Sequence, residues 1–381
     1  ALKEVGEVFT TPAFDRLIAP KPPSVKVGLS IKGNLVEISP LADEVPPDEV
    51  GALLSSYRRR QRFHQLKDGT LVKLSGANLS TLDRLASDLD LSEQQLNSGL
   101  IELPGGRAFL LDGELPDDGS DVVKDASFTE YIDDLKIIDP KSYEVPDSLK
   151  HILRPYQVEG FQWLNTLCDK GFGGILADEM GLGKSVQLIA LLLSRYQRNT
   201  GEMGDGSLGP SLIVCPASLV YNWGAEFTKF APSFNAVVMA GTKAERRTAI
   251  GRAFRADEPT VLITSYDLLR RDVDDYTANE QRFNVMALDE AQYIKNHTTK
   301  IAKAVKAVAA DHRFALTGTP IENRLSELWS IFDFLMPGLL GSYKRFHERY
   351  ELPISNARAA DGSTAEGRAA AQVNPEAARV S

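Results

Sequence analysis

Asp178-Glu-Met-Gly-Leu-Gly-Lys-Ser185 is the stretch of this 381-residue chain that decides its fold. The apolar run 174–177 precedes the stretch, and the amphipathic run 186–193 follows it. This pattern predicts a strand, then a glycine-rich turn, then a helix. A strand, a turn and a helix in this order form the layout that holds the phosphates of a nucleotide.

Individual residues of this stretch have chemistry that suits phosphates. Gly181 and Gly183 carry no Cβ, so backbone N–H groups there can approach phosphate oxygens closely. Lys184 can reach the β and γ phosphates of ATP, and the Ser185 hydroxyl can ligate Mg²⁺. Asp178 stands where the general phosphate-loop pattern has glycine. The alternative is a glycine-rich helix start with an ordinary lysine, and only downstream residues decide between the two.

An acidic pair follows a second apolar segment. Residues 284–288 predict a short strand, which ends at Asp289 and Glu290. Open α/β sheets place their chemistry at the carboxyl ends of strands. Asp289 would hold Mg²⁺, directly or through water, and Glu290 would polarise an attacking water; we include Gln292 in the same catalytic group. The alternative is a pair of carboxylates at the start of a helix, which the upstream phosphate loop disfavours.

Two further segments complete the candidate site. Residues 313–316 predict another strand. It ends at Thr317, Gly318 and Thr319, whose hydroxyls and glycine can sense the γ phosphate; the alternative is an ordinary strand-to-helix turn. Upstream, Gln157 offers an amide donor and an acceptor that suit the adenine edge. The alternative for Gln157 is a solvated helix residue.

These segments, in this order, resemble the SWI/SNF-like ATPases of helicase superfamily two. In that family the phosphate loop typically has the sequence DEMGLGK followed by Ser or Thr, so Asp178 fits the family's pattern. The acidic box reads DEAQ here, close to the family's commoner DEAH. The resemblance covers residues 150–350. The matching segments are 153–157, 178–185, 213–216, 264–266, 289–292, 316–323 and 328–335.

The resemblance implies a RecA-like α/β lobe and a bacterial-type, ATP-driven translocase that moves on double-stranded DNA and remodels protein–DNA complexes. ATP and Mg²⁺ are the implied cofactors, with Ser185 and Asp289 as metal ligands. The implied nucleotide contacts are Gln157, Asp178, Met180, Gly181, Leu182, Gly183, Lys184 and Ser185. The implied catalytic residues are Lys184, Asp289, Glu290 and Gln292. The implied DNA contacts are Pro216, Ala217, Ser218, Thr264, Ser265 and Tyr266, and the implied coupling residues are Thr317, Gly318 and Thr319.

A second RecA-like lobe, which motors of this family need, is not evident in the sequence. In the family this lobe supplies an arginine finger from a motif resembling Q-x-x-G-R-x-x-R, and no such motif follows Asn323. Arg358 and Arg368 lie in a region without strand or helix pattern. A missing arginine finger costs about 10³–10⁵ in rate. We therefore expect the chain to bind ATP, to hydrolyse it poorly, and to need a second lobe from the parent chain or from a partner.

A different class of function stays open. The chain could be a nucleotide-gated interaction module, which binds ATP, changes the conformation of its loops and recruits partners without turnover. A small-molecule kinase is a third interpretation. It is disfavoured because it explains neither residues 317–323 nor the long separation of Lys184 from Asp289.

Composition bounds the class of protein. With 43% hydrophobic and 25% charged residues, the chain has the composition of a globular protein, and no apolar run predicts a membrane span. The net charge of −9 argues against a strong standalone grip on DNA. The basic cluster at 58–62 is typical of a solvated helix face, and a phosphate contact is the alternative. Cys168 and Cys215 fall in apolar segments and are expected in the core. We expect a cytoplasmic, nucleoid-associated protein.

Strands and helices alternate between residues 149 and 352, the range that we assign to the ATPase lobe. This alternation predicts a parallel sheet with helices on both faces. The predicted strands are 174–177, 212–215, 236–239, 261–264, 285–288 and 314–316. The predicted helices include 158–168, 185–195, 218–230, 243–254 and 298–309. Residues 199–210 predict a surface loop.

Residues 1–148 predict a smaller α+β accessory domain without a catalytic group, similar to the region before the motor in bacterial members of the family. We favour a structural support over a ligand site, and we count a protein partner through this region among the candidates. The predicted hairpins pair 25–29 with 34–38 and 63–66 with 71–74. The predicted helices are 48–62 and 80–89, the second capped by Ser80. Residues 117–120 predict an acidic turn and 139–147 a linker, and the tail at 353–381 is expected to be disordered.

Overall fold

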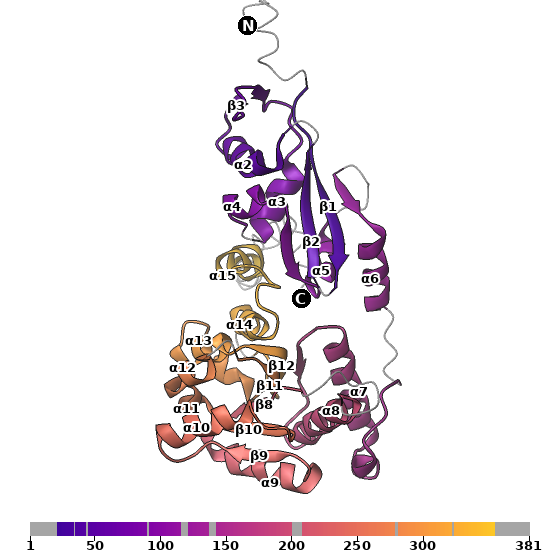
Figure 1. Ribbon diagram of the computed structural model, residues 1–381, viewed down its shortest axis with the longest axis vertical. Helices are drawn as coiled ribbons and strands as arrows, with labels where there is room; N and C mark the ends of the chain where they lie inside the picture. The colour runs from indigo at the N-terminus through magenta and orange to yellow at the C-terminus, as the bar shows by residue number, and fades with distance from the viewer. Residues whose placement is uncertain are drawn as a thin grey trace, which may run out of the picture. The chain divides into compact units, whose positions relative to one another are not determined.

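The structure, a computed structural model, describes residues 21–33, 35–42, 45–89, 91–115, 121–136, 142–199, 208–278, 281–321 and 324–354. The chain divides into two compact units, Ala1–Ile137 and Ile138–Ser381, whose elements are labelled in Figure 1. Several predictions fall wholly or partly outside the described residues. They concern the acidic turn at 117–120, the linker at 139–147, the loop at 199–210, the end of segment 316–323 and the tail at 353–381.

Parallel strands form the centre of the second unit. The strands are β7 (Gly174–Leu176), β8 (Ser211–Cys215), β9 (Asn235–Val238), β10 (Thr260–Ser265), β11 (Phe283–Asp289) and β12 (Ala310–Leu316). Within the described residues they pair in the order β7-β12-β11-β8-β10-β9, and every pairing is parallel. The strands are mostly apolar because parallel strands are covered on both faces. The predicted RecA-like parallel sheet is confirmed.

Helices cover both faces of this sheet (Figure 1). They are α7 (Pro155–Asp169), α8 (Lys184–Asn199), α9 (Val220–Phe230), α10 (Lys243–Ala253), α11 (Tyr266–Arg271), α12 (Val273–Tyr276), α13 (Lys300–Ala307) and α14 (Leu325–Leu335). The short helix α15 (Tyr343–Phe346) contacts α14. Because side chains alternate along a strand, Ile213 and Cys215 of β8 join a core with α7, α8 and α9. Leu212 and Val214 join a second core with α10, α11, α13 and α14. Cys168 lies with Cys215 in the first core, and both are free thiols, as predicted.

Four helices of the second unit begin one to three residues away from the predicted position, at 155, 184, 220 and 300, and local contacts explain the starts of α7 and α13. α7 begins at Pro155, because the fixed φ of proline suits the first position of a helix. Gln157 Oε1 also accepts a hydrogen bond from the Arg154 N–H at 2.9 Å, which satisfies a donor at the helix start. α13 begins at Lys300, because the Thr299 hydroxyl accepts a hydrogen bond from the Ala302 N–H at 3.1 Å.

The first unit is built on a mixed sheet, in the order β5-β2-β1-β6. Its strands are β1 (Val25–Lys32), β2 (Leu35–Ala42), β5 (Ile101–Pro104) and β6 (Val122–Lys124), and a separate hairpin joins β3 (Phe63–Gln65) to β4 (Leu71–Lys73). Both predicted hairpins are confirmed, because β1 pairs with β2 and β3 with β4 in antiparallel fashion. The helices are α2 (Val50–Arg58), α3 (Ser80–Asp88), α4 (Glu93–Asn97), α5 (Arg107–Glu114) and α6 (Ala126–Lys136).

The predicted cap of α3 is wrong. Ser80 is the first residue inside the helix, Leu79 occupies the cap position, and no side chain makes a capping hydrogen bond there. Leu79 is buried, and a β-bridge between Ser24 and Asn78 fixes the chain just before it. Packing of the preceding chain, rather than local capping chemistry, therefore sets where α3 begins.

His312 on β12 is held as a neutral ring. Arg195 of α8 places its Nη2 3.0 Å from His312 Nε2. A guanidinium group can only donate, so Nε2 accepts and the ring proton lies on Nδ1. Burial, together with the charge of Arg195, lowers the pKa of His312 to about 4. Protonation of this ring in the folded state is therefore opposed at mildly acidic pH.

We expect the free energy of unfolding to fall by about 2 kcal/mol between pH 7 and pH 5 on account of His312. The unfolded ring gains its proton near its ordinary pKa of 6.5, whereas the folded ring gains it only near about 4. The stabilisation is therefore complete above the unfolded pKa and is lost as the pH falls towards the folded one. Urea denaturation at both pH values should show that the fall in unfolding free energy disappears in His312→Gln. The fall should remain in His151→Gln, a change at an exposed position. An unchanged pH dependence in His312→Gln would contradict the assignment.

Candidate active site

Three loops that carry predicted site residues meet at one edge of the sheet. β12 lies between β7 and β11, so the loops that follow these three strands are neighbours at their carboxyl ends. A Cβ built on Gly318, after β12, would lie 3.8 Å from the Asp178 carbonyl oxygen and 3.9 Å from the Met180 nitrogen. The third predicted segment therefore lies directly against the loop after β7.

The loop after β7 has the backbone of a phosphate cradle. Gly181 and Gly183 adopt φ values of +85° and +76°, which side chains other than glycine rarely tolerate. A Cβ on Gly183 would also clash with the Gln157 side-chain nitrogen. α8 begins at the next residue, Lys184, so its free N–H groups face the loop. The absence of a Cβ and the start of a helix together fit an anionic ligand such as a phosphate.

Lys184 lies over this loop. Its ammonium group donates to the carbonyl oxygens of Asp178 at 2.7 Å and Glu179 at 3.1 Å. Gln187, one turn further along α8, donates from Nε2 to Asp178 Oδ2 at 2.9 Å and so fixes the side chain at the first position of the loop. The ammonium is thus held where phosphate oxygens in the cradle could replace the carbonyl groups as its partners.

Gln157 is buried against the phosphate loop. Its Oε1 accepts from the Arg154 N–H, and its Nε2 donates to the Leu182 carbonyl oxygen at 2.9 Å. The Tyr156 hydroxyl donates to the same carbonyl at 3.0 Å. The amide that we predicted to contact adenine is thus engaged within the protein and joins α7 to the loop. Its burial, with 7% of the residue exposed, rules out the alternative of a solvated helix residue.

The other predicted nucleotide contacts differ in how far they are buried. Ser185 is half-buried in the first turn of α8, next to Lys184. Met180 is 76% exposed, so its side chain is free of the protein core. Ser185 and Asp289 offer hydroxyl and carboxylate oxygens, the ligand types that Mg²⁺ prefers. Among the described residues, no group of three or more His, Cys, Asp or Glu side chains is placed to hold a metal ion by itself.

Asp289 is held by two donors at the end of β11. The Trp223 indole N–H donates to Oδ2 at 2.9 Å, and the Glu290 backbone N–H donates to Oδ1 at 3.0 Å. The Tyr266 hydroxyl donates to the Asp289 carbonyl oxygen at 2.8 Å. Burial raises the pKa of Asp289, and the hydrogen bond from Trp223 opposes that rise. The carboxylate is therefore fixed in orientation while it lies in a poorly solvated place.

Glu290 has a strained backbone and a defined side chain. Its φ of +53° and ψ of +55° lie in the left-handed region, which costs about 1–3 kcal/mol for a residue with a Cβ. Gln292 donates from Nε2 to Glu290 Oε2 at 2.7 Å, and the Thr317 hydroxyl donates to Gln292 Oε1 at 2.9 Å. A continuous path of hydrogen bonds therefore joins the segment after β12 to Glu290.

The residues predicted to contact DNA fall into two groups. Ala217 and Ser218 are exposed in the short helical turn Ala217–Leu219 after β8, beside the partly buried Pro216. Thr264, Ser265 and Tyr266 are buried, with 0%, 5% and 2% of each residue exposed.

The side chains of the second group are buried within the protein, and a contact of this segment with DNA stays a prediction. β10 continues to Ser265, whose hydroxyl accepts from the Leu268 N–H at 3.3 Å and so caps α11. The side chain of Tyr266 is directed to the acidic box instead, where it stacks on Tyr293 with ring centroids 4.8 Å apart. Tyr266 therefore supports the acidic box from within the protein.

Sequence reasoning missed Trp223 and Gln187, and it gave Tyr266 a different role. Trp223 lies 66 residues before Asp289, and no local pattern connects the two positions. Gln187 falls on the buried face of an amphipathic helix, where sequence favours core packing. The contacts that these residues make arise from the parallel sheet and were visible only in three dimensions.

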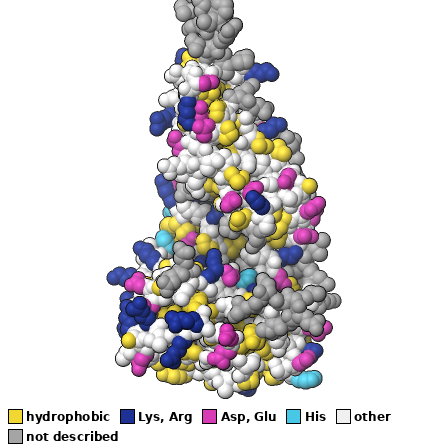
Figure 2. Space-filling model, in the orientation of Figure 1, with side chains coloured by type: hydrophobic (Ala, Val, Ile, Leu, Met, Phe, Trp, Pro, Cys, Tyr) yellow, Lys and Arg dark blue, Asp and Glu magenta, His cyan; other side chains and the backbone are white. Residues whose placement is uncertain are grey.

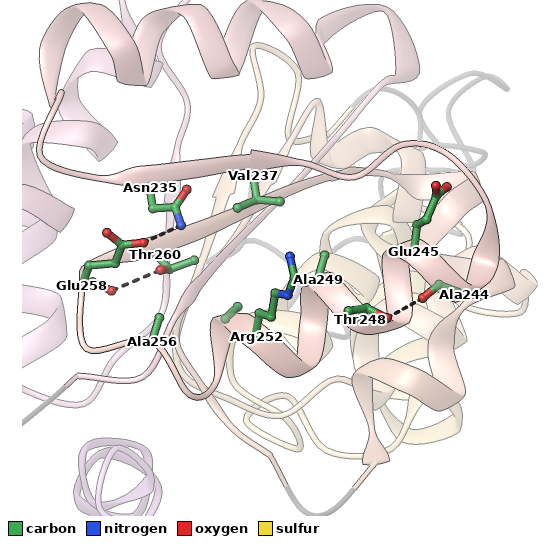
Figure 3. Close-up of a pocket in the computed structure, with 11 residues that line it drawn as sticks. Asn235, Val237, Ala244, Glu245, Thr248, Ala249, Arg252, Ala256, Glu258 and Thr260 are labelled. Atoms are coloured by element: carbon green, nitrogen blue, oxygen red, sulfur yellow. Dashed lines mark hydrogen bonds between the residues drawn. The ribbon is translucent and has the colours of Figure 1, made fainter.

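A separate cavity of about 670 Å³ lies between β9 and α10 (Figure 3). β9 is the outermost strand on the side of the sheet away from β7. The walls of the cavity combine alanine side chains with Glu245, Arg252 and Glu258. None of its eleven lining residues belongs to the predicted sites. In the parts of the chain that the structure describes, no helix has the length and apolarity needed to cross a membrane.

Comparison with known proteins places both parts of the chain. The SNF2-related domain family matches residues 156–372, and the bacterial SNF2 helicase associated family matches residues 1–146. The chain is 42% identical over 243 residues to the TATA-binding protein-associated factor MOT1 of Saccharomyces cerevisiae, over 61% of this chain and 13% of that protein. It is 44% identical over 237 residues to an uncharacterized ATP-dependent helicase of Mycoplasma pneumoniae, over 59% of this chain and 22% of that protein.

A solved structure also matches. The Sulfolobus solfataricus SWI2/SNF2 ATPase core in complex with dsDNA is 39% identical, over 59% of this chain and 43% of that chain, with a TM-score of 0.48. The match spans only 13% of the length of the yeast protein and 22% of the length of the Mycoplasma protein.

Gly183→Ala should weaken nucleotide binding at least about 10-fold, because the added Cβ clashes with Gln157 and the left-handed φ costs about 1–2 kcal/mol. Gly69→Ala is the matched control, since Gly69 also has a positive φ, of +93°, but a Cβ there meets no atom within 4 Å. Both variants should lose stability on urea denaturation, and only Gly183→Ala should lose affinity in a titration with ATP. Equal ATP affinity in the two variants would argue against the cradle.

Proposed function

This chain belongs to the SNF2-related family, with a bacterial SNF2 helicase associated region before it, and from that premise we propose that it forms the ATP-binding lobe of a DNA-dependent ATPase. The observation that carries the proposal is the meeting of the phosphate loop, the acidic box and the segment after β12 at one sheet edge. The proposed lobe comprises residues 149–352, and residues 1–148 form the accessory domain.

The phosphate loop binds the triphosphate of ATP in this proposal. Gly181 and Gly183 let backbone N–H groups face the phosphates, and Lys184 exchanges its carbonyl partners for β and γ phosphate oxygens. Ser185 and Asp289 hold Mg²⁺, which when bound neutralises charge on the phosphates. Gln157 keeps the loop in place through the Leu182 carbonyl, and its contact with adenine stays a prediction.

Glu290 orients the attacking water. Its side chain is already held by Gln292, and Gln292 is held by Thr317 from the neighbouring loop. A change at the segment 317–319 when the γ phosphate is present or absent would therefore reach Glu290 through two hydrogen bonds. The strained backbone of Glu290 fits a residue whose geometry matters for chemistry rather than for stability.

Double-stranded DNA is the proposed activator, and protein bound to DNA is the proposed target. The names of the relatives, an ATP-dependent helicase and a TATA-binding protein-associated factor, support both. Ala217 and Ser218 are exposed and can meet phosphates through backbone N–H groups.

On the face in Figure 2, Lys and Arg side chains gather most densely at the lower left, where Figure 1 places α10 and α11, with Asp and Glu side chains among them. Such mixed charge and the net charge of −9 suit a weak, local contact.

We infer that the chain turns over ATP poorly by itself. An arginine finger from a second RecA-like lobe is worth about 10³–10⁵ in rate, and the sequence shows no motif for it. A nucleotide-gated interaction module is the second candidate function, and the hydrogen-bond path from Thr317 to Glu290 favours it, because that path could change loop conformation without turnover.

Lys184→Ala should lower ATP affinity at least about 10-fold, because the ammonium no longer meets the phosphates. Lys26→Ala, at an exposed position of β1 in the other unit, is the control and should bind as the unmodified chain does. Calorimetric titration with MgATP measures the affinity, and phosphate release with and without double-stranded DNA measures turnover. Equal affinity in the two variants would refute the nucleotide site. Fast, DNA-stimulated turnover by this chain alone would refute the inference that it turns over ATP poorly.

A further inference from the structure

Trp223 is the side chain that fixes the carboxylate of Asp289 from outside the acidic box. It lies in the first turn of α9, with only 2% of the residue exposed. Its indole N–H reaches Asp289 Oδ2 at 2.9 Å. Indole nitrogen can donate but cannot accept, so this contact is productive only with an unprotonated oxygen of the carboxyl group.

The hydrogen bond leaves the carboxylate with one defined orientation. Oδ1 is held at 3.0 Å by the Glu290 backbone N–H, which belongs to the same loop and moves with it. The Trp223 N–H is the donor that comes from a separate helix. Each oxygen keeps a further lone pair, so the two donors set the plane of the carboxylate while a cation can still be bound. Partners of this kind orient metal-binding side chains and raise metal affinity.

The indole ring is itself fixed by the core. Trp223 packs on Phe227 with ring centroids 6.3 Å apart, and Phe227 packs on Phe234 at 5.8 Å. Tyr196 of α8 completes the row, at 5.9 Å from Phe234. The donor is therefore carried on a row of aromatic rings between α9 and α8, the helix that begins at the phosphate loop.

α9 also connects this donor to an exposed loop. The turn Ala217–Leu219 leads directly into α9, and Trp223 follows within one helical turn. Ala217 and Ser218 in that turn are exposed, whereas Trp223 is buried. A shift of the turn would move the first residues of α9 and with them the indole N–H. The chain thus has a short mechanical route from an exposed loop to Asp289.

We propose that Trp223 is a positioning residue that orients Asp289 for Mg²⁺ and transmits the state of the loop 216–218 to it. This inference rests on the proposed function, in which Asp289 is a magnesium ligand. A Trp223 that merely fills the core would stabilise the fold without affecting Mg²⁺. The two roles differ in whether the N–H group, as distinct from the ring, is needed.

Trp223→Phe keeps an aromatic ring and removes the donor. We expect the Mg²⁺ concentration that half-saturates the enhancement of nucleotide binding to rise about 10-fold to 100-fold. Binding of the non-hydrolysable analogue AMPPNP without Mg²⁺ should stay within about twofold, because the phosphate loop is unchanged. Equilibrium titration of AMPPNP across a series of MgCl₂ concentrations measures both quantities without relying on turnover.

Trp329→Phe is the matched control. Trp329 is also buried, and its indole N–H donates to the Gly341 carbonyl oxygen at 3.2 Å, so the variant loses a comparable hydrogen bond away from Asp289. Replacement of Trp223 by benzothienylalanine, which exchanges the N–H for sulfur at nearly constant ring size, covers the case in which Trp223→Phe does not fold. A loss of magnesium affinity in both Trp223 replacements, and not in Trp329→Phe, supports the positioning role.

Other outcomes separate the inference from the function beneath it. If the unmodified chain shows no Mg²⁺-enhanced binding of AMPPNP, the proposed function fails. If it shows that enhancement and the Trp223 replacements retain it in full, the positioning role alone fails. Double-stranded DNA tests the link to the loop: a shift in the Mg²⁺ midpoint that Trp223→Phe abolishes supports it. No shift in the unmodified chain, or the same shift in the variant, overturns that link.

Discussion

Parallel pairing of β12 with β7 on one side and β11 on the other is the constraint on which the whole site depends. It brings together three loops that are far apart in the chain and places them at one sheet edge. Parallel strands need long crossover connections, which here are helices that cover the sheet. The two apolar cores that these helices form with the strands hold the edge rigid. The position of the phosphate loop is therefore a consequence of core packing.

Asp289 loses hydration because of this arrangement, and neighbouring hydrogen-bond donors offset part of that loss. A carboxylate at the end of a buried strand is poorly hydrated, and burial raises its pKa. Donors from α9 and from the following residue compensate for part of the lost hydration. The next residue, Glu290, is left in a left-handed backbone conformation. Local stability is thus reduced beside the carboxylate that we propose as a magnesium ligand.

Aromatic residues tie the loops to one another. Trp223 reaches the Asp289 side chain from the helix after β8, and Tyr266 reaches the Asp289 backbone from the helix after β10. Each follows a strand end that the sequence motifs assigned to DNA contact. Of these two segments, the one after β8 exposes Ala217 and Ser218, whereas Tyr266 after β10 is buried and supports the acidic box. Two segments to which the resemblance gives the same role therefore differ in the structure: one is exposed and the other is buried.

The sequence by itself determined the strands of the second unit and the parallel sheet, and it identified the segments that we propose bind the nucleotide, because apolar runs, glycine spacing and chain order are local properties. It also determined both hairpins of the first unit, through their turn residues. Only the tertiary structure decided that Ser80 is not a cap, that Thr264 is buried, that Gln157 holds the phosphate loop and that Trp223 donates to Asp289. Each of these depends on partners brought close by packing, and the spacing of residues along the chain carries no record of such distances.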